Sequence, residues 1–268
     1  MSLAARTFSG AISLTKANIA QALHYRLVLV IYALRQIVNP LLYMAVWWAV
    51  AGDGEVGGFQ RGDVVMYYIV FMIVSHATWA VGYHQWWPLI RLGRLSPHLM
   101  RPINPIWVSA SGDLASKLTA AAMVSPIWLA MYFIIRPEFP FDWGNAVLFV
   151  PALLLAAALA FIVGTCMGLA SFWVANTWPF YSIWHNIAFS IGGQVAPIAL
   201  LPGEIQTIAI GLPFRYTIGF PIEVFIGHLQ RDELILGFAL QAVWIAVGLT
   251  LMTLLWRSGI KRYQAVGV

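Results

Sequence analysis

The chain has 268 residues, of which 61% are hydrophobic and only 9% are charged, and its mean hydropathy is +0.79. Soluble domains carry roughly 25% charged residues, so this composition excludes a soluble enzyme, a disordered chain and a nucleic-acid-binding protein. The formal net charge of +5 comes from sparse bases that separate apolar runs, which is typical of topology signals in membrane proteins. Because Cys166 is the single cysteine, neither an internal disulfide nor a cysteine-based metal site is possible. We expect one transmembrane domain over residues 1–268.

The first 25 residues are predicted to form a helix that lies in the cytoplasmic membrane interface. Phe8, Ile12, Ile19 and Leu23 fall on one face of such a helix, as an interfacial helix requires. A frayed polar leader is the alternative. A cleavable signal peptide is not expected, because these residues lack a compact apolar core that is followed by a small-residue cleavage site.

Six apolar segments are long enough to cross a bilayer, which requires about 20 residues in helical form. A membrane β-barrel would instead show segments of about ten residues with alternating hydrophobicity. We therefore predict an all-α integral membrane protein with six transmembrane helices. The predicted spans are residues 26–50, 64–87, 106–135, 145–175, 178–201 and 234–256.

Two of the predicted spans carry polar side chains that are candidates for a transport path. In the first span, Arg35 either faces protein or a cavity together with its polar neighbours, or reaches the cytoplasmic headgroups. In the fifth span, polar residues recur at three- and four-residue steps, and we favour helix packing over a path as their role. In the third span, Asp113 and Lys117 have the spacing of a structural ion pair. The path candidates are Arg35, Asn39, Tyr43, Ser182, His185, Asn186 and Gln194.

The segment between the second and third spans, residues 89–105, combines an apolar stripe with basic residues. Leucines at helical spacing predict a short amphipathic element, and Pro97 favours two short turns over one helix. Such a surface suits docking on another protein or on anionic lipid, although a basic inner loop also serves as a topology signal alone. The residues concerned are Arg91, Leu92, Gly93, Arg94, Leu95, Leu99 and Arg101.

Residues 197–233 are predicted to enter the membrane from the outer side and return. Prolines divide this segment into apolar pieces that are too short to cross a bilayer, and an ordinary apolar outer loop is the alternative. Glu204 and Glu223 each follow a proline by two residues, which predicts a place in the first turn of a short helix. Arg215 lies between them and completes the candidate residues of this segment.

The charges predict that both termini are cytoplasmic, because cytoplasmic loops are enriched in lysine and arginine. An even number of spans requires the same arrangement. Nine of the fifteen bases fall on the side of the termini, and nine of the ten acids fall on the other side. The bases are Arg6, Lys16, Arg26, Arg91, Arg94, Arg101, Arg257, Lys261 and Arg262, and the acids are Asp53, Glu55, Asp63, Glu138, Asp142, Glu204, Glu223, Asp232 and Glu233.

The order of several motifs resembles the permease subunits of type-2 ABC exporters, and in particular a six-span bacterial branch in which two related permeases often accompany one ATPase. The motifs lie in residues 91–102, with Met100 where leucine is expected, and in residues 197–202, 212–216, 220–221 and 261–267. The resemblance covers nearly the whole chain. It implies an interfacial helix at the N-terminus, a coupling element in residues 89–105 that contacts the ATPase, and re-entrant helices in residues 197–233.

The resemblance also implies a permease of the bacterial inner membrane. It would dimerise with an identical or related permease and export a hydrophobic or amphipathic substrate. The chain contains no G-x-x-x-x-G-K-[ST] loop, so ATP and magnesium are expected in a separate ATPase subunit and not in this chain. The alternative class is a haem-binding or catalytic membrane protein that uses His76, His84 or His185.

Overall fold

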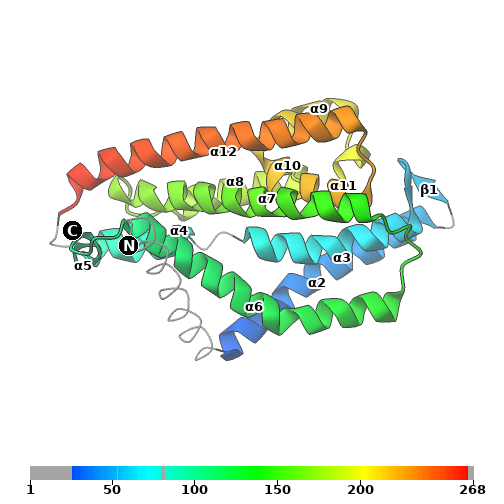
Figure 1. Cartoon of the computed structure of the whole chain (residues 1–268), viewed down its shortest axis with the longest axis horizontal. Coiled ribbons are helices and arrows are strands. Elements are labelled where there is room, and N and C mark those ends of the chain that lie inside the picture. The colour runs from blue at the N-terminus through cyan, green and yellow to red at the C-terminus, as the bar shows by residue number, and fades with distance from the viewer. Residues whose placement is uncertain (1–25, 53, 80–81, 265–268) are drawn as a thin grey trace, which may run out of the picture.

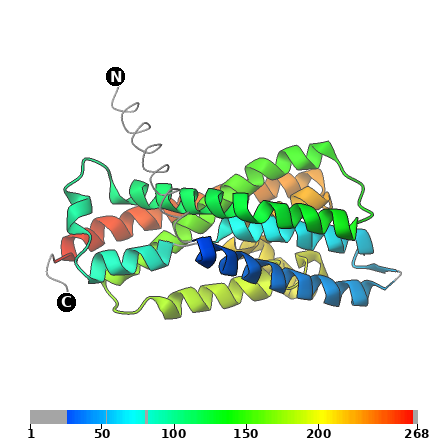
Figure 2. The same ribbon diagram turned by 90° about the horizontal axis from the view of Figure 1, so that it is seen from below.

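A computed structural model describes residues 26–52, 54–79 and 82–264, and the side chains of residues 26–36 and 83 lie outside the description. The interfacial helix predicted for residues 1–25 therefore lies outside the described residues. The described chain is a bundle of long helices whose two ends carry the connecting loops (Figures 1 and 2). We refer to the end with the short strands β1 (Glu55–Val56) and β2 (Phe59–Gln60) as the hairpin end, and to the opposite end as the α5 end.

The described chain contains helices joined by short connections. The helices before the centre of the chain are α2 (Arg26–Ala51), α3 (Arg61–Thr78), α4 (Gly82–Arg91), α5 (Ser96–Leu99) and α6 (Pro105–Ile135). Next come α7 (Trp143–Leu169), the 3-10 turn η1 (Ala170–Phe172) and α8 (Trp178–Ile191). The last part contains η2 (Ile198–Leu200), α9 (Gly203–Gly211), α10 (Pro213–Thr217), α11 (Gly219–Ile226), α12 (Arg231–Gly259) and η3 (Ile260–Arg262).

Polar residues at the N-terminal ends of the long helices cap their first backbone groups. The side chain of Asn104 accepts a hydrogen bond from Ile106 N at 2.9 Å, and that of Asp142 accepts one from Gly144 N at 3.0 Å. At the start of α12, the carboxylate of Glu233 accepts from Gln230 N at 2.8 Å. These contacts satisfy backbone groups that a helix end otherwise leaves without a partner.

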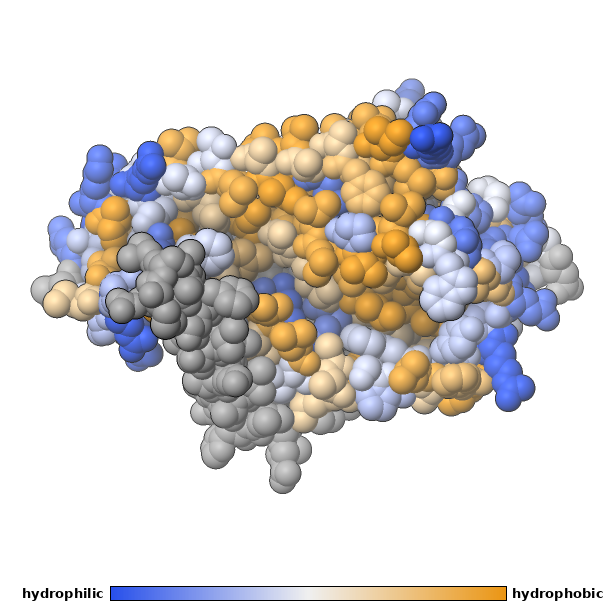
Figure 3. Space-filling model, viewed as in Figure 1, coloured by the Kyte–Doolittle hydropathy of each residue, from blue (hydrophilic) through white to orange (hydrophobic). Residues whose placement is uncertain are grey.

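Three of the described helices are long and apolar enough to cross a membrane by length and composition: α6, α7 with η1, and α12 with η3. They contain 27 to 31 residues before the 3-10 turns are added, which corresponds to roughly 40 Å or more at 1.5 Å per residue. Hydrophobic residues form a broad band along the bundle, and hydrophilic residues gather at both ends (Figure 3). The protein is therefore of the all-α integral membrane class.

Two of the six predicted spans differ from the observed helices. The segment predicted over residues 64–87 is divided into α3 and α4, and Trp79 at the break has an extended backbone with ψ of 118°. In the segment predicted over residues 178–201, the α-helix ends at Ile191, because Gly192 and Gly193 follow and Gly193 has φ of +91°. This left-handed conformation favours glycine and cannot continue a helix.

Helix α7 lies at the centre of the bundle and packs against α3, α4, α10, α11 and α12. Small residues allow the closest of these contacts. A Cβ atom at Gly237 of α12 would stand 2.0 Å from the ring of Phe220, and one at Gly82 of α4 would stand 3.1 Å from the backbone of α7 at Gly164. Glycines thus let α12 pack closely against α11, and α4 against α7.

Candidate functional site

Residues 89–105 contain the end of α4 and the short helix α5, so they do not form one continuous helix, but the break lies around Gly93 and not at Pro97 as expected. Helix α4 ends at Arg91, and α5 begins at Ser96 with Pro97 in its first turn. Gly93, between the two helices, has φ of +68°, so the chain reverses at a position where a side chain would be strained.

This reversal separates the three leucines, and the predicted common apolar stripe is wrong. Leu95 is fully buried and packs with Trp86 and Leu169, whereas Leu92 and Leu99 remain exposed. Arg91 is half-buried, and its Nε atom is buried with no hydrogen-bond partner. A mixed apolar and basic surface remains, which we call the α5-end patch: Leu92, Arg94, Leu99, Met100 and Arg101.

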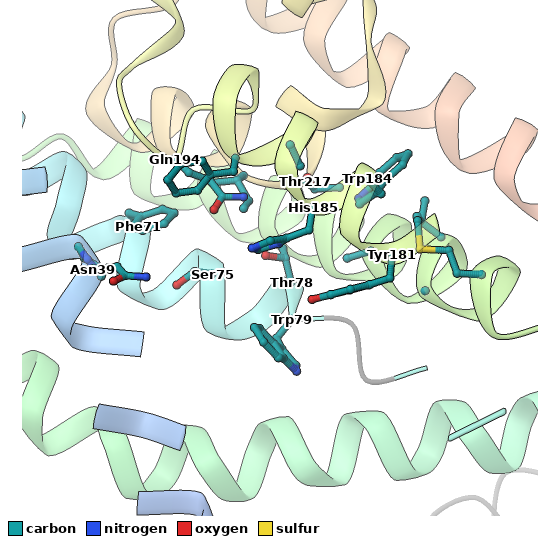
Figure 4. A pocket seen from close by; sticks show the side chains of 18 of the residues that line it. Asn39, Phe71, Ser75, Thr78, Trp79, Tyr181, Trp184, His185, Gln194 and Thr217 are labelled. Atoms are coloured by element: carbon teal, nitrogen blue, oxygen red, sulfur yellow. The ribbon is translucent and has the colours of Figure 1, made fainter. Parts of the chain in front are cut away.

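A cavity of about 340 Å³ lies between α2, α3, α7 and α8, near α10 (Figure 4). It brings together four of the predicted path residues from two separate regions of the sequence: Asn39 and Tyr43 of α2, and His185 and Gln194 in and after α8. Amides, hydroxyls and imidazoles thus meet in one hollow, and a few such polar groups in a mostly apolar pocket are typical of sites that orient a small molecule.

Aromatic residues that sequence reasoning did not assign to a site form much of the cavity wall. They come from α3 and its end, and from α8, so only the packed bundle brings them together. The spacing of residues along one helix cannot predict a cavity wall that several helices build together. The aromatic rings are those of Phe71, Trp79, Trp178, Tyr181, Trp184 and Phe189.

Three predicted path residues are not placed at the cavity. Ser182 and Asn186 lie on α8 outside the cavity lining, where Asn186 Nδ2 donates to Ser182 Oγ at 3.5 Å. Arg35 belongs to α2, but its side chain lies outside the description. Helix α8 therefore divides its polar residues between the cavity and another face.

The backbone that follows α8 is supported by aromatic side chains of α2 and α3. Tyr67 donates its hydroxyl proton to the carbonyl of Gly193 at 2.7 Å. The carbonyl of Val195 accepts from the Tyr68 hydroxyl at 2.6 Å and from Trp47 Nε1 at 2.7 Å. Non-helical backbone is tolerated at membrane depth only where protein satisfies its polar groups in this way.

In residues 197–233, the three candidate charges have different surroundings. Glu204 lies exposed in the first turn of α9, as the sequence predicts. Glu223 is the fifth residue of α11 and not in its first turn, because α11 begins at Gly219 before Pro221. Its carboxylate instead pairs with Arg215, whose Nη2 lies 2.6 Å from Oε2.

The ion pair predicted in the third span is present: Lys117 Nζ lies 2.7 Å from Asp113 Oδ2 in α6. His76 Nε2 of α3 lies 3.0 Å from the carbonyl oxygen of Lys117. These contacts connect α3 with α6, which indicates a structural role. His84 and His185 line the cavity but His76 does not, and within the described residues no three histidine, cysteine, aspartate or glutamate side chains cluster as metal ligands do.

Comparisons with known proteins add one match. The family model described as ABC-2 family transporter protein matches residues 30–267. No curated protein matches the sequence. The matched range includes every described residue from α2 at residue 30 to residue 264, so the cavity and the α5-end patch both belong to it.

Proposed function

The chain belongs to the ABC-2 family of transporter proteins, and from this membership we propose that it is the permease subunit of a bacterial ABC exporter. A permease of this family is a membrane component of an ABC transporter. The export direction, the partners, the six crossings and the substrate are parts of the proposal. The direction rests on the family resemblance alone, and structural observations support the other parts.

In the proposed topology the chain crosses the membrane six times. Helices α3 and α4 together form the second transmembrane segment, and α8 with residues 192–200 forms the fifth. Helix α8 has 14 residues and spans about 21 Å, which is less than the roughly 30 Å of a bilayer core. The hydrogen bonds from Trp47, Tyr67 and Tyr68 support non-helical backbone over the remaining distance. Helices α9 to α11 are then the re-entrant segment, which enters from the hairpin end.

The α5 end is cytoplasmic in this proposal, and both termini are on the cytoplasmic side of the membrane. The exposed bases of this end, Arg94, Arg101, Arg257, Lys261 and Arg262, support the orientation through the positive-inside rule. The acids Glu55, Glu138, Asp142 and Asp232 are exposed at the hairpin end, which becomes the outer side.

A separate ATPase binds ATP and magnesium and docks on the α5-end patch. The patch is suited to a protein partner because it combines exposed apolar groups with bases. Met100 is 88% exposed and Leu92 is 49% exposed, next to the exposed Arg94 and Arg101. Exposed apolar groups beside bases, outside the hydrocarbon layer, are typical of a surface that binds another protein.

The cavity between α2, α3, α7 and α8 is part of the substrate path, and it opens toward a second permease, identical or related. Its aromatic wall and its neutral polar groups suit a hydrophobic or amphipathic molecule. The observation that carries this assignment is the meeting of Asn39, Tyr43, His185 and Gln194 in one cavity.

The test of the proposed function uses the chain purified together with the products of its neighbouring genes. We expect an ATPase to copurify, and we expect Arg94→Glu with Arg101→Glu to lower ATP hydrolysis of the complex at least severalfold. Arg231→Glu is the control, because Arg231 is an exposed base at the first residue of α12, on the hairpin end. Failure of any ATPase to copurify, or equal hydrolysis in all three proteins, contradicts ATPase docking.

The substrate path has its own test in inverted membrane vesicles. We expect His185→Ala and Gln194→Ala to reduce ATP-dependent uptake of a hydrophobic dye panel, while Ser182→Ala on the same helix leaves uptake unchanged. An optical spectrum separates the alternative class, since a haem protein shows a Soret band and a permease without haem does not.

A further inference from the structure

The side chain of Tyr263, after the last helix, reaches back to the segment between α4 and α6. Its hydroxyl oxygen accepts a hydrogen bond from Ser96 N at 3.0 Å and shares a second with Ser96 Oγ at 2.9 Å. The two residues are 167 positions apart in the sequence. One side chain thus joins the chain after α12 to the first residue of α5.

The hydrogen bonds with Tyr263 cap the start of α5, which has no capping side chain of its own. The residue before α5 is Leu95, whose side chain makes no capping hydrogen bond. The amide of Ser96 is among the donors that a helix start leaves without an intrahelical partner, and the Tyr263 hydroxyl accepts from it. A helix of four residues has no independent stability, so α5 depends on Tyr263 and on the burial of Leu95 for its position.

Helix α12 is attached along its length to the core of the bundle. Near the α5 end, Trp256 packs edge-to-face against Trp86 of α4, with ring centroids 5.6 Å apart. Farther along, Gln241 Nε2 donates to the carbonyls of Ala152 at 3.0 Å and Tyr216 at 3.1 Å. Tyr216 belongs to α10, whose last residue Thr217 lines the cavity.

A continuous structural connection therefore runs from α5 through Tyr263 and α12 to α10 and the cavity wall. We propose that Tyr263 is a positioning residue: it holds residues 92–101 to α12, so that a displacement of the α5-end patch by a docked ATPase is transmitted to α10. This inference rests on the proposed function. The tether itself is a property of the chain alone and can be measured without any partner.

The first experiment measures the tether in the chain alone, reconstituted in nanodiscs. Tyr263→Phe keeps the ring and removes the hydroxyl. We expect hydrogen–deuterium exchange in residues 96–101 to accelerate about fivefold, as the loss of one hydrogen bond of typical net strength predicts, with no change in α7. Tyr132→Phe is the control, because Tyr132 is an exposed tyrosine at the far end of α6. Unchanged exchange in Tyr263→Phe overturns the proposal.

The second experiment measures the amount of hydrophobic dye transported per ATP hydrolysed in the complex with the ATPase. We expect Tyr263→Phe to lower this ratio at least threefold while the basal hydrolysis rate changes less than twofold. Ser96→Ala keeps the backbone hydrogen bond and should produce a smaller loss. A faster exchange rate with an unchanged ratio makes Tyr263 a purely structural residue and overturns the positioning role. Failure of an ATPase to copurify contradicts the proposed function, while the exchange result still decides whether the tether exists.

Discussion

The guanidinium of Arg215 lies against the carboxylate of Glu223, with Nε 3.0 Å and Nη2 2.6 Å from the same oxygen, Oε2. Both residues are buried, and the Arg215 guanidinium carbon lies 6.0 Å from the ring centres of Tyr216 and Phe220. Helices α10 and α11 therefore fold around two paired charges. A buried pair of this kind tolerates the loss of neither partner.

Replacing Glu223 by glutamine should destabilise the protein, because the charge of Arg215 would stay buried without its partner. Breaking a buried ion pair costs about 3 to 5 kcal/mol. The free energy of unfolding, measured by titrating a denaturing detergent into mixed micelles, checks this. Glu204→Gln is the matched control, since Glu204 is exposed in α9. Equal stability of the two variants would show that the pair contributes nothing.

Adding a methyl group at Gly237 should weaken the contact between α12 and α11. A Cβ atom there would stand 2.0 Å from the ring of Phe220, and overpacking of this kind costs about 1 to 3 kcal/mol. We expect Gly237→Ala to lower the melting temperature in detergent. Gly211→Ala, where nothing lies within 4 Å of the added atom, should leave it unchanged. A melting temperature that falls equally in both variants contradicts the close packing.

Water should reach the cavity, and cysteine labelling in nanodiscs can detect it. The native cysteine is first removed by Cys166→Ala. In that background, we expect the cysteines introduced by Ser75→Cys and Gln194→Cys to react with a small polar thiol reagent about tenfold faster than the one introduced by Ile183→Cys, because the reactive thiolate forms only in a polar setting. Ser75 and Gln194 line the cavity, whereas Ile183 is 60% exposed elsewhere on α8. Labelling at Ile183 as fast as at Ser75 would contradict a separate aqueous cavity.

His98 in α5 should titrate below the usual range of histidine. Partial burial lowers the pKa of this imidazole, and the nearby charge of Arg101 lowers the pKa further. Because the folded form disfavours the protonated ring, the fold of this segment loses stability as the pH falls from 6.5 through the lowered pKa. NMR titration should show that Arg101→Gln raises the pKa of His98, while Arg94→Gln does not. No shift in Arg101→Gln would contradict the contribution of that charge.

Helix boundaries illustrate what can be predicted locally and what cannot. That residues 89–105 do not form one helix was predictable from Pro97, but the break falls at Gly93, and Pro97 lies in the first turn of α5. The break after Thr78 was not predictable, since apolar residues continue through it. The exposed or buried state of Leu92 and Leu95 was also missed, because the turn at Gly93 changes the direction of the helix axis.

The candidate site shows the same distinction. Asn39 with Tyr43, and His185 with Gln194, were identifiable as polar residues on apolar helices, because a polar group in a lipid environment is costly. Their shared cavity, its aromatic wall and the exclusion of Ser182 depend on how α2, α3 and α8 pack. Packing joins residues that are more than a hundred positions apart, and one sequence contains no periodic signal for such pairs.

By itself, the sequence determined that this is a helical membrane protein with charges sorted to its two ends and with a basic, apolar segment between two helices. These properties follow from the hydrophobic effect and from charge, which act on each segment separately. Only the tertiary structure decided that Arg215 pairs with Glu223 and that Tyr263 caps α5 at Ser96. Such contacts require donor and acceptor atoms to meet at about 3 Å, and only the complete packing of the helices determines where they meet.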